Sequence, residues 1–267
     1  MGRLSRAALT PWQSWGGQRI LVVAPHPDDE IAGCAGTLLH HLAAGDEVCI
    51  LFVTDGGSSR ALGLNREEMV RRRHLEAAAV VRASGVSHSI WMGLPEGNWQ
   101  PEQFWPQWQS ALAEWQPQMM YVPSRIDFHP EHHQAAYALS RNLPDEMVMR
   151  VYQIQVPLTA VLSNIIINVS QWSAQINQLI HCYHTQRQSL AAIIRPRQYA
   201  AQYYGQGQLI EPFWQMNAAA YKQLHQKAPT TWSSSPFRGL RYRSFADPLA
   251  YVQGKQMRQG LSVQAFK

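Results

Sequence analysis

Short apolar runs alternate with longer amphipathic stretches along the first half of the chain. The apolar runs predict strands, and they cover residues 19–24, 47–54, 87–92, 118–122 and 149–155. The stretches between them predict helices, and they cover residues 30–44, 65–84, 101–115 and 130–141. Gly45 and Gly85 follow the first two helices, where a C′ glycine is expected. This alternation is typical of βαβ units.

The alternation weakens after about residue 157. Residues 170–190 still predict a helix, residues 210–224 predict a shorter one, and residues 228–267 predict irregular structure. The sequence therefore predicts an α/β fold, a Rossmann-like, mostly parallel sheet sandwiched by helices, with an irregular C-terminal extension. We divide the chain into an α/β core at residues 1–190 and a basic extension at residues 191–267 that packs on the same domain.

Composition describes an ordinary globular protein. The chain has 267 residues, of which 46% are hydrophobic and 15% are charged. No apolar stretch approaches the roughly 18 residues that a membrane span needs. Polar residues interrupt the N-terminal region before a signal peptide could form, so we expect a cytoplasmic protein. The three cysteines, Cys34, Cys49 and Cys182, show no Cys-x-x-Cys spacing, which argues against disulfides and against a cysteine zinc site.

The net charge of +5 is unevenly distributed. Residues 191–267 contain ten Lys or Arg against two acids, whereas the first 190 residues contain 13 bases against 16 acids. A basic surface could bind nucleic acid, but no nucleic-acid motif accompanies the charge, so we predict no nucleic-acid partner. The same charge could bring the protein to an anionic membrane surface, where each base adds about 1 kcal/mol.

Candidate chemistry begins where the first predicted strand ends, at Pro25-His26-Pro27-Asp28-Asp29-Glu30. One imidazole and three carboxylates at the end of a buried strand are costly unless they are compensated, and a bound metal would compensate them. In open α/β sheets ligands bind beyond the carboxyl ends of the strands. His26 and Asp29 are three residues apart, a spacing at which two side chains can chelate one divalent ion.

A second cluster follows the fourth predicted strand, at Asp127-Phe128-His129-Pro130-Glu131-His132-His133. A catalytic zinc usually takes three protein ligands and keeps one position open for water. His26, Asp29 and one histidine of the second cluster would complete such a set. Asp28 would then be free for proton transfer, and His133 is more readily explained as a helix residue with no role.

Each cluster also has a simpler explanation. Either one alone could be a helix cap whose acidic side chains interact favourably with the N-terminal end of the helix dipole. Two such motifs at two strand ends nevertheless favour a shared site. A metal-dependent phosphoesterase would use similar residues, but such enzymes commonly hold two metals and need more carboxylates than the first cluster offers. A protein that binds anionic surfaces without catalysis is the third alternative.

Several short segments together form a pattern: Val22–Glu30, Ala35–Leu38, Thr54-Asp55-Gly56, Arg73-x-x-Glu76, Gly93–Gly97 and His129-Pro130-Glu131-His132. In these segments the chain resembles the PIG-L or LmbE-like family of zinc-dependent N-acetylglucosaminide deacetylases. The resemblance extends to about residue 140. Two positions depart from the family pattern, because Glu96 and Glu131 stand where aspartate is usual.

The resemblance implies a function and a role for each matching residue. His26, Asp29 and His132 would bind Zn²⁺, and Asp28 would be the general base. His129 would assist the tetrahedral intermediate or the leaving amine, or would instead be an alternative zinc ligand.

Three further residues complete the predicted site. Arg73 and Glu96 would lie on the substrate side. Asp127 is placed with them, and could instead orient one of the histidines. The expected substrate is an N-acetylglucosamine-type amino-sugar conjugate, either a small molecule or lipid-linked. Neither the molecule that carries the acetamide nor the oligomeric state can be read from the sequence.

Overall fold

The computed structural model describes residues 10–11, 16–124, 127, 129–152, 154, 163–205 and 207–226. The strands of these residues form one sheet in the order β1-β7-β8-β6-β5-β2-β3-β4. Their bounds are β1 Thr10–Pro11, β2 Arg19–Ala24, β3 Glu47–Thr54, β4 His88–Leu94, β5 Met119–Val122, β6 Val148–Val151, β7 Ile165–Asn168 and β8 Ile210–Asn217. Strands β2 to β6 are parallel, and β8 runs antiparallel to β6 and β7.

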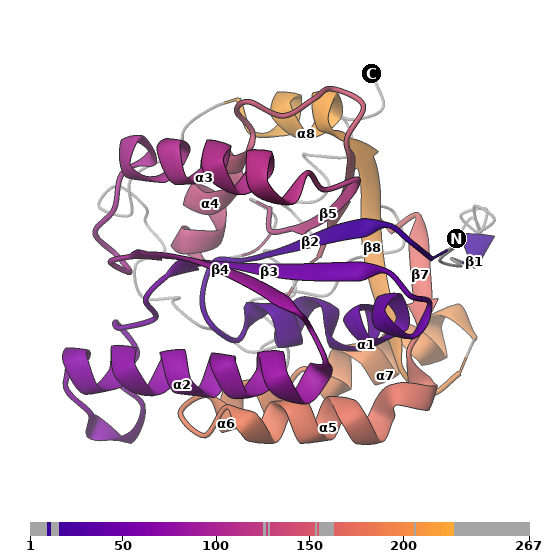
Figure 1. The fold of residues 1–267 in the computed structure, drawn as a ribbon. Coiled ribbons are helices and arrows are strands. Elements are labelled where there is room, and N and C mark those ends of the chain that lie inside the picture. Colours follow the sequence, from indigo (N-terminus) through magenta and orange to yellow (C-terminus); the bar gives the residue numbers. More distant parts are fainter. Residues whose placement is uncertain are drawn as a thin grey trace, which may run out of the picture.

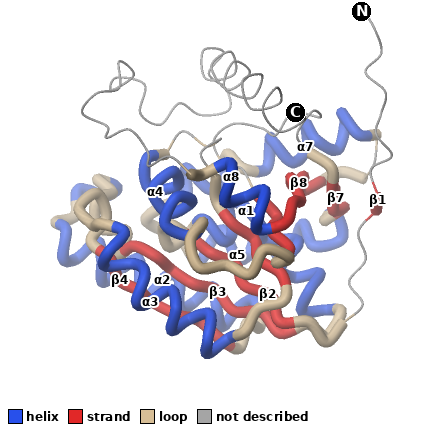
Figure 2. Tube along the Cα trace, turned by 90° about the horizontal axis from the view of Figure 1, so that it is seen from above, coloured by secondary structure: helices blue, strands red, loops and turns tan. Residues whose placement is uncertain are grey.

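Helices cover both faces of the sheet (Figure 1). Their bounds are α1 Asp29–Ala43, α2 Arg66–Ser84, α3 Pro101–Trp115, α4 Pro130–Leu139, α5 Ser173–Cys182, α6 Arg187–Ala191, α7 Ile194–Tyr204 and α8 Ala218–Leu224. Helices α3, α4 and α8 lie on one face, and α1, α2, α5, α6 and α7 lie on the other. Figure 2 shows β2, β3 and β4 side by side, with β7 and β8 on the opposite side of the sheet from β4. The predicted α/β fold is confirmed.

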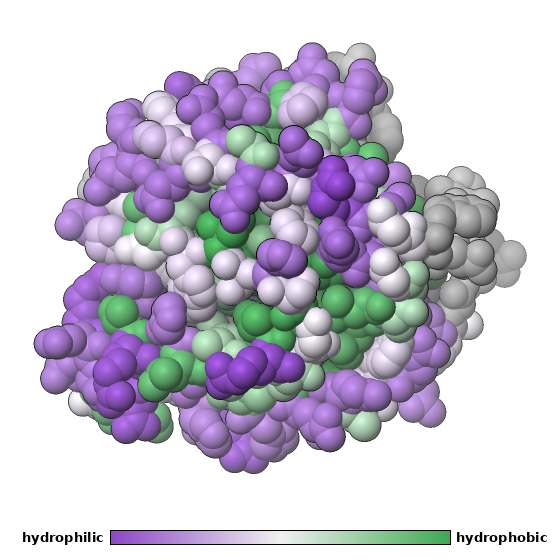
Figure 3. All heavy atoms as spheres, viewed as in Figure 1, coloured by the Kyte–Doolittle hydropathy of each residue, from purple (hydrophilic) through white to green (hydrophobic). Residues whose placement is uncertain are grey.

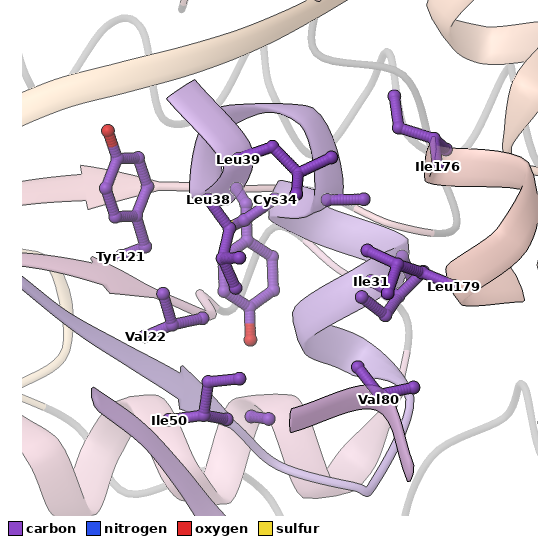
Figure 4. Close-up of a cluster of buried hydrophobic side chains, with 14 of the residues drawn as sticks. Val22, Ile31, Cys34, Leu38, Leu39, Ile50, Val80, Tyr121, Ile176 and Leu179 are labelled. Carbon is purple, nitrogen blue, oxygen red and sulfur yellow. The ribbon is translucent and has the colours of Figure 1, made fainter. Parts of the chain in front are cut away.

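Side chains of the central strands alternate between two cores. Ile20 and Val22 of β2 belong to the core under α1, whereas Leu21 and Val23 belong to the core under α3 and α4. Figure 4 shows α1 packed between the sheet and α5, with Ile31 close to Leu179. Burying an aliphatic side chain of this size stabilises the fold by about 1.5–3 kcal/mol. The end of β2 is therefore held rigidly from both faces.

An aromatic side chain of the edge strand β4, that of Trp91, is packed between neighbouring rings at the edge of the sheet. Figure 3 shows hydrophobic residues gathered in the band between the two helical layers and hydrophilic residues over the helices. The Trp91 ring of β4 lies 4.2 Å from the ring of Phe52 and 4.2 Å from that of His74. Flanking rings therefore cover much of this large apolar side chain at the sheet edge. No helix among the described residues is long and apolar enough to cross a membrane.

The structure differs from the sequence prediction mainly in the second half. Residues 210–224 were predicted to be one helix, but they form strand β8 followed by the short helix α8. The prediction of one helix over residues 170–190 was also wrong, because α5 ends at Cys182 and Tyr183 leaves the helical conformation at φ −94° and ψ 81°. Strand β6 is shorter than predicted, and Gln155 lies outside the described residues, as does the extension at 228–267.

Strand β8 ties the second half of the chain to α1. Its Glu211 accepts hydrogen bonds from the backbone N–H groups of Gly36 and Thr37 and from the Thr37 hydroxyl. Arg197 of α7 lies 2.6 Å from the same carboxylate and also donates to Ile31 O on α1. Residues 210–217 are thus integrated into the sheet, and the division of the chain at residue 190 stays a prediction.

Candidate active site

The site lies at the carboxyl ends of β2 and β5, two neighbouring strands. The chain leaves β2 toward β3 on one side and returns as β5 on the other, so this is the switch point where α/β sheets bind ligands. After β2, the turn Pro25–Asp28 leads directly into α1. After β5, residues 123–129 lead into α4.

Asp29 joins the two motifs. Its Oδ2 accepts the backbone N–H of His26 at 2.8 Å and lies 2.9 Å from His26 Nδ1. The same oxygen lies 3.1 Å from Nε2 of His132, which comes from the second motif. Asp127 Oδ2 lies 2.8 Å from His132 Nδ1 and thereby sets the orientation of that ring. The structure therefore brings together the residues that the sequence places 103 positions apart.

Charges in this cluster are balanced around the Asp29 carboxylate. Burial would raise the pKa of Asp29, but the imidazoles of His132 and His26 hold it well below its usual value. Burial would lower the pKa of His132, but Asp29 and Asp127 raise it well above its usual value, and Asp29 likewise raises the pKa of His26. A divalent cation bound at this carboxylate would compete with protons for the two rings.

The donor atoms of this cluster fit a divalent metal. Nitrogen and oxygen atoms of two sets lie within 4.8 Å of one another, one set being His26, His129 and His132, and the other His26, Asp28 and Asp29. Nε2 of His26 is buried and has no hydrogen-bond partner among the described residues, although Glu96 Oε1 lies 3.5 Å away. Imidazole nitrogens and carboxylate oxygens are common ligands of catalytic zinc. The chemistry of the donor set therefore suits zinc.

Asp28 occupies an unusual backbone conformation beside this cluster. Its φ of 149° and ψ of −21° are costly for a residue with a Cβ, by about 1–3 kcal/mol. Arg73 Nη2 donates to Pro27 O and, at 2.9 Å, to Asp28 Oδ1. Burial raises the pKa of Asp28 to about 6, because it outweighs the opposing effect of Arg73. A carboxylate with this pKa is suited to accept a proton near neutral pH.

The turn after β3 explains one glycine of the predicted motif. Gly56 has φ 66°, and a Cβ at this position would lie 2.7 Å from Arg73 Nε and 3.1 Å from Pro27 Cδ. A side chain there would displace Arg73 from Asp28. The Thr54-Asp55-Gly56 turn thus allows the guanidinium to approach the Pro27–Asp28 backbone.

Glu96 and Asp127 take different places in the site. One Glu96 oxygen faces His26, and the other accepts the backbone N–H of Ser58 at 2.8 Å. The Asp127 carboxylate is 1% exposed and contacts His132 and the backbone N–H of Ile154. These contacts suit the orienting role of Asp127. Its contact with substrate stays a prediction.

Two further pairs of hydrogen-bonded residues lie next to the site, and the sequence did not predict that these residues pair. The Tyr183 hydroxyl donates to Glu30 Oε1 at 2.6 Å, and burial raises the pKa of Glu30 to about 8. Thr185 donates to Glu76 through its backbone N–H and its hydroxyl. The segment His184-Thr185-Gln186 is similar to a pattern of the family, although the lysine usual before it is absent. Because residues 170–190 read as one continuous helix, the sequence did not place Tyr183 or Thr185 beside the site.

Comparisons with known proteins agree with this geometry. Residues 21–143 match the family model described as PIG-L, GlcNAc-PI de-N-acetylase. The matched segment covers a little less than half of the chain. All eight site residues predicted from the sequence lie within this matched segment, whereas Tyr183 and Thr185 lie beyond it. Among curated proteins, none matches the sequence.

Solved structures share the fold of most of this chain. N,N'-diacetylchitobiose deacetylase from Pyrococcus horikoshii matches with a TM-score of 0.65 and 18% identity, over 76% of this chain and 85% of that enzyme. The conserved protein TT1542 from Thermus thermophilus gives 0.60 and 26%, over 82% of this chain and 100% of that protein. GalB, the 4-carboxy-2-hydroxymuconate hydratase from Pseudomonas putida, gives 0.62 and 14%, over 74% and 96%. Since a hydratase shares the fold, the reaction has to be argued from the site.

Proposed function

We propose that this protein is a zinc-dependent hydrolase that removes the acetyl group from an N-acetylglucosamine-type amino-sugar conjugate. The observation that carries the proposal is the cluster at the ends of β2 and β5, in which the rings of His26 and His132 both contact the same oxygen atom of Asp29. Asp28, held by Arg73, lies directly beside it. The match to the PIG-L family model and the fold shared with a diacetylchitobiose deacetylase support the same reaction class.

In this proposal His26, Asp29 and His132 hold the metal. A zinc ion bound there would supply an activated water and would polarise the acetamide carbonyl. Asp28 accepts the proton of the attacking water, for which its pKa of about 6 is suitable. Arg73 keeps that carboxylate oriented, since its guanidinium is 3% exposed and its Nη2 donates to Asp28.

His129 acts in this proposal as a neutral hydrogen-bond donor. Burial lowers the pKa of His129 well below its usual value, and the neighbouring His26 and His132 lower it further. Its Nδ1 accepts the backbone N–H of Glu131 at 3.3 Å, so the proton of the neutral ring resides on Nε2. An Nε2–H group beside the cluster can stabilise the negative charge that develops on the acetamide oxygen.

Glu96 provides the polar contact to the sugar in this proposal. Its carboxylate lies between His26 and Ser58 at the border of the cluster. A carboxylate accepts hydrogen bonds only, so it selects hydroxyl or N–H groups of the substrate. Asp127 contributes by fixing the ring of His132.

The proposal is tested by measuring metal content and acetate release on the full chain. We expect about one zinc per chain and release of acetate from N,N'-diacetylchitobiose or from a lipid-linked N-acetylglucosamine in liposomes. Asp28→Asn should keep the metal and lower kcat by at least about 10³-fold, because a positioned base and its charge are both lost. Asp145→Asn is the control, since the Asp145 side chain is 67% exposed and pairs with Lys222.

Two results would contradict the proposal. The first is a purified protein that binds no divalent metal after zinc is supplied. The second is about two metals per chain with release of phosphate from phosphoesters and none of acetate, which would favour the phosphoesterase alternative.

A further inference from the structure

The segment Tyr183–Gln186, which joins α5 to α6, is hydrogen-bonded to α1, to α2 and to the loop after β3. The Tyr183 hydroxyl donates to Glu30 on α1 at 2.6 Å. Thr185 donates to Glu76 on α2, at 2.9 Å from its backbone N–H and at 2.6 Å from its hydroxyl. Gln186 Nε2 donates to Ser59 Oγ in the loop after β3 at 2.9 Å. We call residues 183–186 the strap.

The first of these contacts leads to the backbone of Asp28. Glu30 is 0% exposed, and its two carboxylate oxygens have different partners. Oε1 accepts the Tyr183 hydroxyl, and Oε2 accepts the backbone N–H of Asp28 at 3.0 Å. Tyr183 is itself 0% exposed, so water does not compete for its hydroxyl. Tyr183 thus orients the Glu30 carboxylate through one oxygen, and the other oxygen holds the backbone N–H of Asp28.

The second contact leads to the side chain of Asp28. Glu76 lies one helical turn after Arg73 on the same face of α2, and both residues are buried. The two bonds from Thr185 fix that turn of the helix against the strap. Arg73 then reaches Pro27 O and Asp28 Oδ1. The strap therefore acts on Asp28 by two routes, through its amide and through its carboxylate.

We propose that Tyr183 and Thr185 are positioning residues for Asp28, so the strap determines where the proposed general base stands. This inference rests on the proposed deacetylation. A backbone conformation such as that of Asp28 persists only where the surrounding contacts over-determine it. A displacement of about 1 Å at a reacting group can lower a rate by about 10²-fold. The contacts of the strap supply the constraint that keeps Asp28 in place.

Tyr183→Phe tests the first route, because it removes one hydroxyl from a buried site. We expect kcat to fall about tenfold with KM changed less than about twofold and zinc content unchanged, as for a group that acts only in the transition state. Tyr221→Phe is the matched control, since the 0% exposed Tyr221 donates its hydroxyl to Pro123 O at 2.7 Å and belongs to the core on the other face of the sheet from Tyr183. The control should lose a similar amount of thermal stability and keep its kcat.

Glu30→Gln provides a conservative rescue. Its amide oxygen can still accept the Asp28 N–H, and its amide nitrogen can donate to the Tyr183 oxygen. We therefore expect Glu30→Gln to keep most of kcat, and Glu30→Ala to resemble Tyr183→Phe. Thr185→Val tests the second route, because it removes the hydroxyl bond to Glu76 while the backbone N–H remains. It should lower kcat less than Tyr183→Phe does.

A crystal structure of Tyr183→Phe gives a readout that does not depend on activity. We expect the φ of Asp28 to relax from 149° toward the β region. An unchanged φ in Tyr183→Phe, or a kcat equal to that of Tyr221→Phe, would overturn the positioning role. If the wild-type protein released no acetate, the proposed function would fail, and the φ of Asp28 in the variant would still decide whether the strap positions this residue.

Discussion

Replacing Arg73 with methionine should make the stability of the protein depend on pH in a new way. The guanidinium is 3% exposed, and its Nη2 donates to Pro27 O and to Asp28 Oδ1. Burial already raises the pKa of Asp28 from 3.8 to about 6, with Arg73 opposing the rise. Without Arg73, burial and the charge of Asp29 act with less opposition, so the pKa of Asp28 rises further.

The magnitude follows from the removal of one close opposite charge. Such a charge typically lowers a carboxyl pKa by about 1–3, so we expect Asp28 in the variant to titrate at about 8. The folded-state pKa of Asp28 lies above the unfolded value of 3.8. The contribution of Asp28 to the free energy of unfolding is therefore fully present at low pH and is lost as pH rises through the folded-state pKa. The loss in the wild type is complete by about pH 6, whereas in the variant it continues to about pH 8. At about 1.4 kcal/mol per pH unit, Arg73→Met costs about 3 kcal/mol more at pH 8 than at pH 5.

Urea unfolding of the metal-free protein measures this difference. The ten tryptophans provide a fluorescence signal, and a chelator removes any metal. Arg72→Met is the control, because the Arg72 side chain is 48% exposed and pairs with Glu68 on the helix surface. Its effect should be the same at both pH values. An equal loss of stability for Arg73→Met at about pH 5 and about pH 8 would refute the reasoning.

Three further outcomes are expected. His132→Ala should lose the bound zinc, and zinc binding to the wild type should release protons and weaken as pH falls, which calorimetry in buffers of different ionisation enthalpy measures. Burial lowers the pKa of His41 to about 4 despite Asp46 at 2.6 Å, so stability should fall by about 3 kcal/mol as pH drops from 6.5 toward 4, and NMR titration of His41 checks its pKa. Glu211→Gln should cost about 3–5 kcal/mol in urea unfolding, because it breaks a buried ion pair with Arg197.

The central strands of the first half could be predicted because they are buried on both faces. Continuous apolar runs at 19–24 and 47–54 mark β2 and β3 with the bounds that the structure has. Strand β8 misled the prediction for a physical reason. Its large apolar residues Ile210, Phe213 and Trp214 are spaced as on one face of a helix, but pairing with β6 and β7 makes the segment a strand. Those partners are distant in sequence, so no local pattern reveals them.

The cluster of the candidate site could be predicted for a similar reason. Two His-Pro-acid motifs stand at the ends of strands, and parallel strands present their carboxyl ends at one edge of the sheet. The partners of Glu30 and Glu76 could not be found in this way. Tyr183 lies 153 positions from Glu30, and Thr185 lies 109 positions from Glu76. Only the folded chain shows that these acids are hydrogen-bonded rather than solvated.

The place of β8 in the sheet has a consequence for how the protein is made. During synthesis β6 leaves the ribosome before β8, so the edge of β6 that pairs with β8 has no partner until Ile210–Asn217 emerges. An unpaired strand edge is a template for association with other chains. Between the emergence of β6 and of β8, the nascent chain therefore exposes a strand edge to which other chains can pair. Pairing of β8 ends that interval and also brings Glu211 to α1, so the helix that follows the candidate site gains these hydrogen bonds only after the second half of the chain is made.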